Sequence, residues 1–585
     1  MKHSFCYLLF VWVCACKVPA QPADPIRLNQ TGYYPHAPKM AVVVEGGADR
    51  FWITRPGGKD TLYRGALSAP RTASFSGKIT RIADFSPWQE PGTYVLGVTG
   101  VGVSYPFEIR ASVHRDIAAA ALKGFYYQRA STPLLPADAG IWAREAGHPD
   151  DQVQVHASAA SPARPAGTLI ASPRGWYDAG DYNKYIVNSG ITMGTLLSLY
   201  EDFPAYVKTF QTEIPERNNA LPDLLDEVCW NLRWMLTMQD PADGGVYHKL
   251  TNPAFGPLAQ APALATGSRF VVQKSTAATL DFAAVMAQAA RVFGAYPEQL
   301  PGLADSCRTA AVAAWQWALL HPAVIYDQEA LNKAYNPDIE TGTYGDHTLT
   351  DEWIWAAAEL YVTTGDTKYY HHQPMVPDDE MPIPSWNQVR LLGYYTLLRH
   401  QAQLGPVASQ DLASLKSGLI RQAQRMTAGL NQHAYATVMG ASAKDYVWGS
   451  SAVAANQGIF LIQAYLHTGE RVWLDAALGN LDYLLGRNAT GYSFLTGYGD
   501  KTPLHPHHRP SEGDEVSLPV PGLLSGGPNP GRQDKCTTYT STFPDECFTD
   551  DACSYASNEI AINWNAPMVY LAAAIEALQE RWTGN

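Results

Sequence analysis

The chain has 585 residues, of which 46% are hydrophobic and 17% charged. Such a composition fills a large core and excludes long disordered stretches. A formal net charge of −13 without a Lys/Arg-rich run argues against nucleic acid and anionic membranes as partners. The length suits about two to four domains, or fewer where one is large and helical.

Residues 1–20 have the pattern of an export signal. A weakly basic start precedes an apolar run at residues 5–16, which is too short to cross a bilayer as a helix. Small residues suit cleavage after Ala20. Alternatively, Val13–Cys16 resembles a bacterial lipobox, in which Cys16 would carry a lipid anchor. We favour cleavage and predict a secreted, periplasmic or cell-surface protein. No later stretch is apolar enough for a transmembrane helix.

Residues 21–110 are predicted to form an immunoglobulin-like β-sandwich. Met40–Val44 and Phe51–Ile53 are apolar runs of strand length, and Pro91–Val98 reads as a turn followed by a strand. Turn signals recur about every ten residues, as in small sandwiches. No group of catalytic side chains is visible here, so we expect this domain to support the part that follows.

Residues 111–585 are predicted to form an all-α catalytic domain. Apolar residues recur there at helical spacing in the segments Ile117–Gln128, Ile191–Tyr200, Leu221–Met238, Ala277–Phe293, Cys307–Leu320, Asp351–Thr363, Ser409–Leu430, Ala452–Leu466, Val472–Leu485 and Met568–Trp582, with a less regular one at Trp386–Gln403. Long stretches rich in Gly, Pro, Asn and Asp separate them. This alternation favours an (α/α)6 toroid whose loops form a cleft at one end.

The most informative segment is Gly175–Tyr185. Asp178 and Asp181 lie three residues apart in it, among aromatic side chains and ahead of a predicted helix. Helix capping would account for one of these acids, but not for the Trp, Tyr and Lys residues around them. A further acid, Glu559, lies far along the chain. Cleavage of a glycosidic bond needs a carboxylic acid and a carboxylate on opposite sides of that bond, so we expect the fold to bring the two segments together.

Residues 176–185 read Trp-Tyr-Asp-Ala-Gly-Asp-Tyr-Asn-Lys-Tyr, which resembles the first signature of glycoside hydrolase family 9, the inverting cellulases. In that family the second Asp is the general base and the first helps to hold the attacking water. The resemblance gives these roles to Asp181 and Asp178. It covers essentially the whole mature chain, including the β-domain in front of the helical one. Arg174 departs from the pattern, since the family often has Gly there.

Residues 557–566 resemble the second signature of the family, whose Glu is the general acid. The resemblance assigns this role to Glu559. Many members carry an Asp five residues before this Glu, whereas Ser554 stands here, with Asp550 and Asp551 just upstream. The pattern therefore leaves open which residue supports Glu559.

A third segment, Pro506–Arg509, resembles the Pro-His-His-Arg motif of the family. Its adjacent histidines lack the helical spacing of a zinc site. In the family the first His of the pair and the Arg hydrogen-bond the sugar, which singles out His507 and Arg509. His248, in Tyr-His-Lys, resembles another residue on the substrate side. Further candidates for contact with sugar rings are Trp564, Trp448 and Tyr177.

An acidic group near Asp351 and Glu352 predicts a structural calcium. Clustered carboxylate oxygens suit this ion, although acids at a helix start also have a simpler explanation in the helix dipole. The family commonly carries calcium near such a pair, and Asp346 is a further candidate ligand. Some relatives bind zinc through Cys and His ahead of the first motif. We expect none here, because that stretch lacks Cys and offers only His148, Asp150, Asp151 and His156. We expect no cofactor for catalysis.

Five cysteines lie outside the export signal: Cys229, Cys307, Cys536, Cys547 and Cys553. An exported protein can oxidise them, but an odd number leaves at least one thiol free. Cys536 and Cys547 could close the loop before Glu559, with Cys553 as a competitor. These five cysteines form no Cys-x-x-Cys pair of the kind that would indicate a zinc site.

The expected activity is endo-cleavage of β-1,4-glucan, such as cellulose, with inversion and with the two carboxyl groups about 6.5–9.5 Å apart. An exo-acting member of the same family is the alternative, with residues 512–551 as a loop that blocks the cleft. A catalytically silent glycan-binding protein is a third possibility, which the presence of all three acids disfavours. We expect a monomer with a polysaccharide or oligosaccharide substrate.

Overall fold

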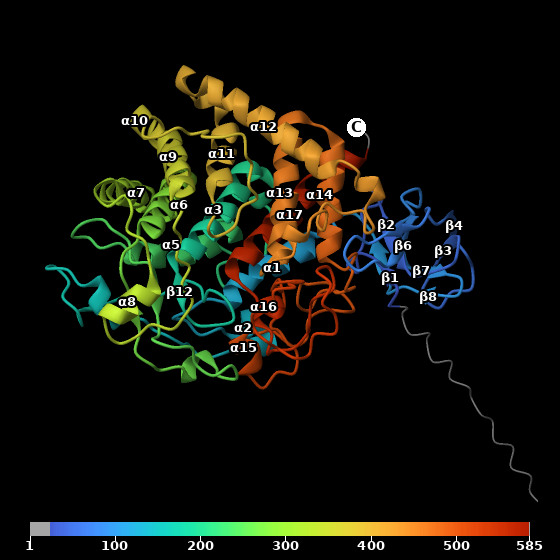
Figure 1. The fold of residues 1–585 in the computed structure, drawn as a ribbon, viewed down its shortest axis with the longest axis horizontal. Helices are drawn as coiled ribbons and strands as arrows, with labels where there is room; N and C mark the ends of the chain where they lie inside the picture. The colour runs from blue at the N-terminus through green and yellow to red at the C-terminus, as the bar shows by residue number, and fades with distance from the viewer. Residues whose placement is uncertain (1–23, 584–585) are drawn as a thin grey trace, which may run out of the picture.

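The computed structural model describes residues 24–583, so the predicted cleavage at Ala20 and the alternative lipid site at Cys16 lie outside the described residues. Figure 1 shows a small sheet domain, drawn in blue, beside a larger helical domain. Across this part of the chain, no helix combines the length and apolar character needed to cross a membrane.

The N-terminal domain consists of two antiparallel sheets. Its strands are β1 (Ile26–Arg27), β2 (Met40–Val44), β3 (Arg50–Thr54), β4 (Tyr63–Ala66), β5 (Arg71–Thr72), β6 (Ile79–Asp84), β7 (Gly92–Val98), β8 (Gly102–Val103) and β9 (Phe107–Ile109). One sheet has the order β1-β2-β6-β5; the other has the order β4-β3-β7-β8, with β9 paired to β7. Buried side chains such as Val43, Phe51 and Leu96 fill the space between the sheets.

Both faces of β2 are buried. Successive side chains of a strand point to opposite faces: Val43 packs in the sandwich core, while Val42 packs against Tyr435 of the helical domain. This explains the continuous apolar run. Asn29 Nδ2 also donates to Asp482 Oδ1 at 2.8 Å, so polar contacts accompany the apolar ones at the domain junction.

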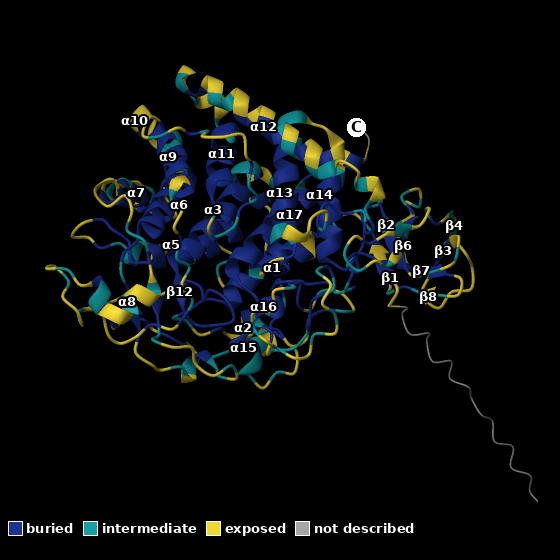
Figure 2. Ribbon diagram, viewed as in Figure 1, coloured by how far each residue is buried: buried dark blue, intermediate teal, exposed yellow. Residues whose placement is uncertain are grey.

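The helical domain contains a helix at every predicted segment. Its longer helices are α1 (Arg115–Tyr127), α3 (Ile186–Asp202), α5 (Asp223–Thr237), α6 (Thr276–Phe293), α7 (Leu303–Leu320), α9 (Thr350–Thr364), α11 (Arg390–Arg399), α12 (Ser409–Thr427), α13 (Ser450–Thr468), α14 (Arg471–Leu484) and α17 (Ile562–Ala577). The short ones are α2 (Pro136–Ala139), α4 (Pro204–Val207), α8 (Gln328–Ala334), α10 (Thr367–Tyr370), α15 (Arg509–Glu512) and α16 (Tyr555–Asn558). Figure 2 shows that most of the longer helices are buried, whereas α12 exposes one face.

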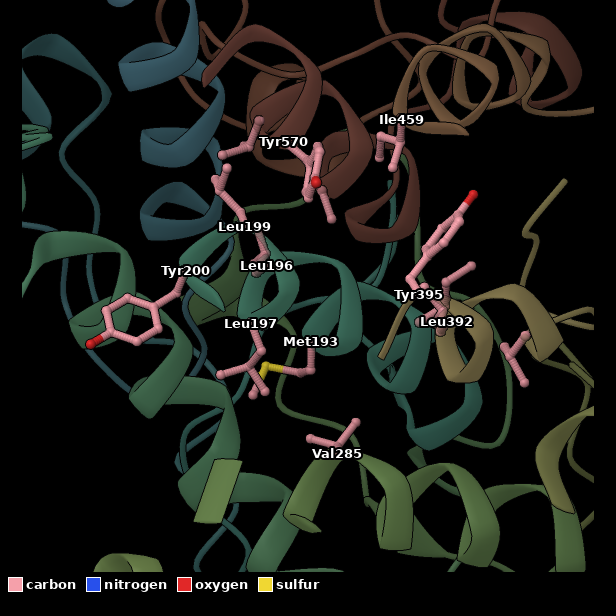
Figure 3. Packing of buried hydrophobic residues seen from close by; sticks show 14 of the residues in the cluster. Met193, Leu196, Leu197, Leu199, Tyr200, Val285, Leu392, Tyr395, Ile459 and Tyr570 are labelled. Atoms are coloured by element: carbon pink, nitrogen blue, oxygen red, sulfur yellow. The ribbon is translucent and has the colours of Figure 1, made fainter. Parts of the chain in front are cut away.

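Helix α3 lies at the centre of this domain. It packs against α5, α6, α11 and α17, and Figure 3 shows its Met193 and Leu196 among side chains such as Val285 and Tyr570. A helix enclosed on all sides is apolar all round, so its sequence lacks a clear polar face. The helix begins five residues before the predicted Ile191. The prediction missed this start because the first turns contain buried polar residues, which interrupt the apolar pattern.

The prediction of an all-α domain is corrected by a small five-stranded sheet. Its strands β10 (Val153–Val155), β11 (Leu169–Ile170), β12 (Lys184–Tyr185), β13 (Lys249–Thr251) and β14 (Phe270–Val271) have the order β11-β10-β14-β13-β12. Strands of two or three residues are too short to show an alternating pattern. The sheet matters for function because β12 directly follows the first acidic motif.

Helix α17 begins at Ile562, six residues before the predicted start at Met568. Pro567 lies inside it, and a proline in a helix interior removes one backbone hydrogen bond, which is why the sequence favoured a later start. The helix packs against α1, α3 and α13, and the tyrosine hydroxyl of Tyr570 donates to Asp202 Oδ2 at 2.6 Å. These contacts hold the chain that carries Glu559 against the first half of the domain.

Candidate active site

Asp178 is held from two directions. The residue is 1% exposed, and its N–H donates to the Asn183 carbonyl at 3.0 Å, which closes the turn between β11 and β12. Its Oδ1 accepts from Asn188 Nδ2 at 2.6 Å, and its Oδ2 accepts from the Tyr344 hydroxyl at 2.8 Å. With both oxygens engaged, this carboxyl group is fixed in position.

Asp181, three residues later, is 5% exposed and is held on one side only. Its Oδ2 accepts from Asn183 Nδ2 and from the Tyr185 hydroxyl, the latter at 3.3 Å. Within residues 24–583, Oδ1 receives no protein hydrogen bond. That oxygen is therefore the one that can accept from a water molecule.

Glu559 reaches these acids through the backbone. It directly follows α16, a single helical turn, and pairs with His507 in a parallel bridge. Three residues later, the N–H of Ile562 donates to the carbonyl of Asp178 at 2.9 Å. The first and second motifs, far apart in the sequence, are thus bonded to each other.

The third motif packs directly on the small residue between the two aspartates. The backbone N–H of Arg509 donates to the Gly180 carbonyl at 3.0 Å, and its Nη1 donates to the same oxygen at 2.8 Å. The His507 carbonyl lies against the Gly180 α-carbon on a face where no side chain would fit. All three motifs therefore meet around one turn.

Two of the three acids, Glu559 and Asp178, have raised pKa values. Burial, together with the charges of Asp181 and Asp178, raises the pKa of Glu559 well above its ordinary value, although Arg509 and the Gly180 backbone act in the opposite direction. Burial and the charge of Asp181 also raise the pKa of Asp178, against the hydrogen bonds from Asn188 and Tyr344. The raised pKa of Glu559 favours its protonated form.

Comparisons with known proteins agree with this geometry. Residues 114–572 match the family model described as glycosyl hydrolase family 9, and residues 21–103 match the cellulase N-terminal ig-like domain. The chain belongs to glycoside hydrolase family 9. The resemblance noted in the three motifs is thereby confirmed, as is an N-terminal immunoglobulin-like domain.

Three similar proteins illustrate the relationship within family 9. A xyloglucan-specific endo-beta-1,4-glucanase of Bacteroides ovatus is 46% identical over 97% of this chain and 96% of its own length. Endoglucanase D of Acetivibrio thermocellus is 33% identical over 94% of this chain and 83% of its own. A solved Bacteroides ovatus structure superposes with a TM-score of 0.91 at 46% identity, over 95% of this chain and 100% of that one.

His507 pairs with Glu559 through the backbone, and one of its ring nitrogens is bonded to the protein. Its Nδ1 lies 2.6 Å from the Ala552 carbonyl, so Nδ1 carries the proton and Nε2 is an acceptor. Burial lowers the pKa of His507, which keeps the ring neutral. The guanidinium of Arg509, by contrast, donates hydrogen bonds to the carbonyls of Gly180 and Gly256. These bonds connect the loop after β13 to the turn that carries the two aspartates.

Two predicted aromatic contacts differ in exposure. Trp448 is 43% exposed, and its ring lies 5.4 Å from that of Tyr555, which in turn lies 5.8 Å from His507. These rings form a row that leads to the acids. Trp564 is only 8% exposed, because its indole packs against Gly449, so little of its ring is open to a ligand.

The predictions for Tyr177 and His248 as sugar contacts do not fit the structure, because neither side chain has exposed surface. The Tyr177 hydroxyl lies 2.8 Å from His148 Nδ1. The two ring nitrogens of His248 lie 2.8 Å from Ser275 Oγ and from the Thr343 carbonyl. Both residues are buried and contact other residues of the protein. The sequence could not show this, because buried and exposed positions of these motifs carry the same residue types.

Sequence reasoning missed Tyr344. Its hydroxyl holds Asp178, and its backbone has a left-handed φ of 45°. The loop that carries it is clamped by His248 on the Thr343 carbonyl and by Lys249 Nζ on the Gly342 carbonyl at 2.6 Å. The glycines on both sides of Thr343-Tyr344 were the available signal of a special backbone conformation.

The predicted calcium ligands lie in a buried acidic cluster that gains a fourth member, Asp281 of α6. Among residues 24–583, six buried carboxylate oxygens of the cluster find no hydrogen-bond partner: both of Asp281, both of Glu352, and one each of Asp346 and Asp351. Burial and the neighbouring acids raise the pKa of Asp281 and Glu352 well above their ordinary values. Buried unpaired carboxylates are costly, so the cluster needs either retained protons or a bound cation.

The stretch weighed for zinc carries an ion-pair cluster instead. Asp150 Oδ2 lies 2.7 Å from Lys184 Nζ, and its Oδ1 lies 3.1 Å from Arg269 Nε. His156 Nε2 lies 2.9 Å from the Pro337 carbonyl. These groups are committed to protein partners and hold the first motif in place.

One disulfide, Cys536–Cys553, is formed within residues 24–583, with a Cα–Cα distance of 5.8 Å. Of the two partners left open for Cys536, the structure pairs it with Cys553 and not with Cys547. Cys547, Cys229 and Cys307 are buried thiols. The disulfide closes the loop directly ahead of α16, so it constrains the chain that presents Glu559.

Proposed function

We propose that this protein is an endo-acting β-1,4-glucan hydrolase that works with inversion. The observation that carries the proposal is that a backbone hydrogen bond joins the segment of Glu559, whose pKa is raised by burial, to the turn that carries Asp178 and Asp181. A matched acid and base is what a single displacement at a glycosidic carbon requires. A protein that only bound glycans would need neither.

In the proposed mechanism, water lies between Asp178 and Asp181. Asp181 takes its proton as the oxygen attacks the anomeric carbon, and Glu559 donates its proton to the leaving oxygen. His507 Nε2 accepts from a sugar hydroxyl. Room for the water requires carboxyl groups about 6.5–9.5 Å apart, and this separation remains a prediction.

The substrate we favour is a xyloglucan or a related β-glucan. The supporting observation is the 46% identity to a relative whose name specifies xyloglucan, which is higher than the 33% to an endoglucanase named without a polymer. The alternative is exo-action. A relative named cellulose 1,4-beta-cellobiosidase from Acetivibrio thermocellus, 31% identical over 95% of this chain and 68% of its own length, supports it.

Three structural proposals accompany this function. The succession of contacts α13–α17–α3–α6–α9–α11 supports an (α/α)6 toroid. The acidic cluster supports a structural calcium held by Asp281, Asp346, Asp351 and Glu352, which would stiffen the loop of Tyr344 without taking part in the reaction. The disulfide supports export to an oxidising compartment.

Product analysis tests the function. The protein is incubated with tamarind xyloglucan, mixed-linkage glucan and carboxymethylcellulose, and products are followed by chromatography and by the NMR signals of the anomeric protons. We expect a rapid fall in viscosity, a mixture of oligosaccharides and α-anomers as first products. Release of one unit from a chain end would favour the exo alternative, and β-anomers would exclude inversion.

A further inference from the structure

The turn that presents Glu559 is supported by a carboxylate from elsewhere in the chain. Ser554 is the N-cap residue of this turn, α16, and the Asp534 carboxylate lies beside it. Its Oδ2 accepts from Ser554 Oγ at 2.7 Å and from the Ala556 N–H at 3.0 Å. Asp534 belongs to the long insert and precedes Glu559 by 25 positions (559 − 534).

Asp534 is the centre of a hydrogen-bonded group around α16. The Tyr539 hydroxyl donates to its Oδ2 at 2.8 Å and lies 3.1 Å from Ser557 Oγ. Ser554 Oγ in turn accepts from the Ser557 N–H at 3.2 Å. The first residues of the turn are thereby connected to one carboxylate, and the turn ends at Glu559.

The chain on both sides of Asp534 is fixed against α16. Cys536 donates its N–H to Asp534 Oδ1 at 3.0 Å, and its disulfide joins it to Cys553, directly before Ser554. On the other side, the Tyr555 hydroxyl donates to the Gln533 carbonyl at 3.0 Å. Burial alone would raise the pKa of Asp534, but the bonds from Cys536 and the hydroxyls outweigh it and lower the pKa. The carboxylate is therefore charged at neutral pH.

We propose that Asp534 is a positioning residue for the general acid, because its carboxylate holds the turn that ends at Glu559. The proposal rests on the proposed function, since it assigns Asp534 a role through Glu559. Asp534 does not contact the reacting bond. It fixes the turn whose last residue must point at the leaving oxygen, among Asp178, Asp181, Tyr344 and Arg509, which are the charged and titratable groups facing Glu559.

The test compares Asp534→Ala with the wild type on two substrates. On an unactivated oligosaccharide, whose leaving oxygen needs a proton, we expect kcat to fall about 10- to 100-fold with KM changed less than about threefold. On 2,4-dinitrophenyl β-cellobioside, whose leaving group needs no proton, we expect kcat within about threefold of wild type. A mobile turn admits water to Glu559 and lowers its pKa, so the alkaline limb of the kcat/KM profile should move to lower pH.

Matched variants separate positioning from general damage. Glu515→Ala removes an exposed acid of the same insert and should leave all three readouts unchanged. Ser554→Asp in the Asp534→Ala background restores a carboxylate beside the turn and should recover at least about tenfold of the lost kcat. If Asp534→Ala does not fold, Asp534→Asn and Ser554→Ala, which remove fewer hydrogen bonds, should show the same substrate-dependent loss to a smaller degree.

Two outcomes would overturn the proposal. One is wild-type kcat and an unmoved alkaline limb in a folded Asp534→Ala; the other is an equal loss on both substrates, which would indicate general damage. Glu559→Ala distinguishes a failure of the proposed function. If the wild type cleaves no glucan, or Glu559→Ala cleaves it as fast, the function fails; if Glu559→Ala loses activity and Asp534→Ala does not, only the present inference fails.

Discussion

The α-carbon of Gly180 faces the backbone carbonyl of His507 so closely that a methyl group on it would lie 2.0 Å from that oxygen. Such a distance is far inside van der Waals contact. The contact joins the turn between the two aspartates to the motif that also pairs with Glu559. A residue without a side chain is therefore required between Asp178 and Asp181.

Gly180→Ala should abolish most hydrolysis by pushing the acid and base segments apart. A displacement of about 1 Å at an active site can cost about 100-fold in rate, and we expect a loss of kcat at least this large. Steady-state kinetics on soluble β-glucan measure it. Gly405→Ala is the control, because a methyl group there would meet open space; equal activities of the two variants would contradict the assigned contact.

Glu559→Gln should lower glucan hydrolysis by about 10²- to 10⁴-fold, the usual contribution of a general acid. Because activity requires the protonated form, the wild-type rate should fall as pH rises through the raised pKa of Glu559. Glutamine does not titrate, so the variant's residual rate should lack this alkaline limb. A pH profile of kcat/KM that keeps the limb would assign it to another group.

Asp181→Ala should lose most hydrolysis yet bind oligosaccharide with near wild-type affinity, since its role is to take a proton from water. Calorimetry with a cello- or xyloglucan oligosaccharide measures binding in the absence of turnover. Asp305→Ala, an exposed acid of α7, serves as the control. Retained hydrolysis in Asp181→Ala would mean that the base lies elsewhere.

Tyr344→Phe removes the donor to Asp178 Oδ2 and leaves that buried oxygen without its partner. A hydrogen bond to a charged group contributes about 1.5–3 kcal/mol, which corresponds to about 10- to 100-fold in rate if it acts on the transition state. Since the Tyr344 bond lowers the pKa of Asp178, its loss should raise that pKa further. The acid limb of the rate profile should then move to higher pH, whereas an unmoved limb would place Tyr344 outside the reaction.

Removal of calcium should destabilise the protein through the acidic cluster. An ion that is present at about 1,000 times its Kd for the folded state adds about 4 kcal/mol. With an unfolding entropy of about 2.1 cal/mol/K per residue, this suggests a fall in Tm of about 3–4 °C on addition of a chelator. Asp281→Asn should weaken this response, and Asp305→Asn should preserve it. Differential scanning calorimetry with and without calcium gives the answer, and a chelator-insensitive wild type would argue against the ion.

The site was predictable where chemistry is contained in a continuous motif. Asp178, Asp181, Glu559 and His507 were predicted in this way, and the structure brings their segments together. Tyr177 was misassigned because neighbouring positions of a turn face opposite ways, which residue type does not reveal.

Residues that act across the fold could not be predicted in this manner. Tyr344, Asp281 and Asp534 each come from a segment that no motif connects to the acids they serve. The fold followed a similar rule: long periodic helices were found, while β12 and the early start of α17 were missed. A strand of two residues is too short to show an alternating pattern. Pro567 falsely indicated a helix boundary, although it lies inside the buried helix α17.

The docking of α17 has a consequence for when activity can arise. The proposed base, Asp181, lies early in the helical domain, but the proposed acid, Glu559, precedes a helix that packs against α1, α3 and α13. During synthesis, before this helix has left the ribosome, the chain contains Asp181 but has no contacts that hold Glu559 beside it. We therefore expect activity to appear only after α17 has docked. The rate at which turnover of a chromogenic glycoside appears can then be used to measure the last step of refolding.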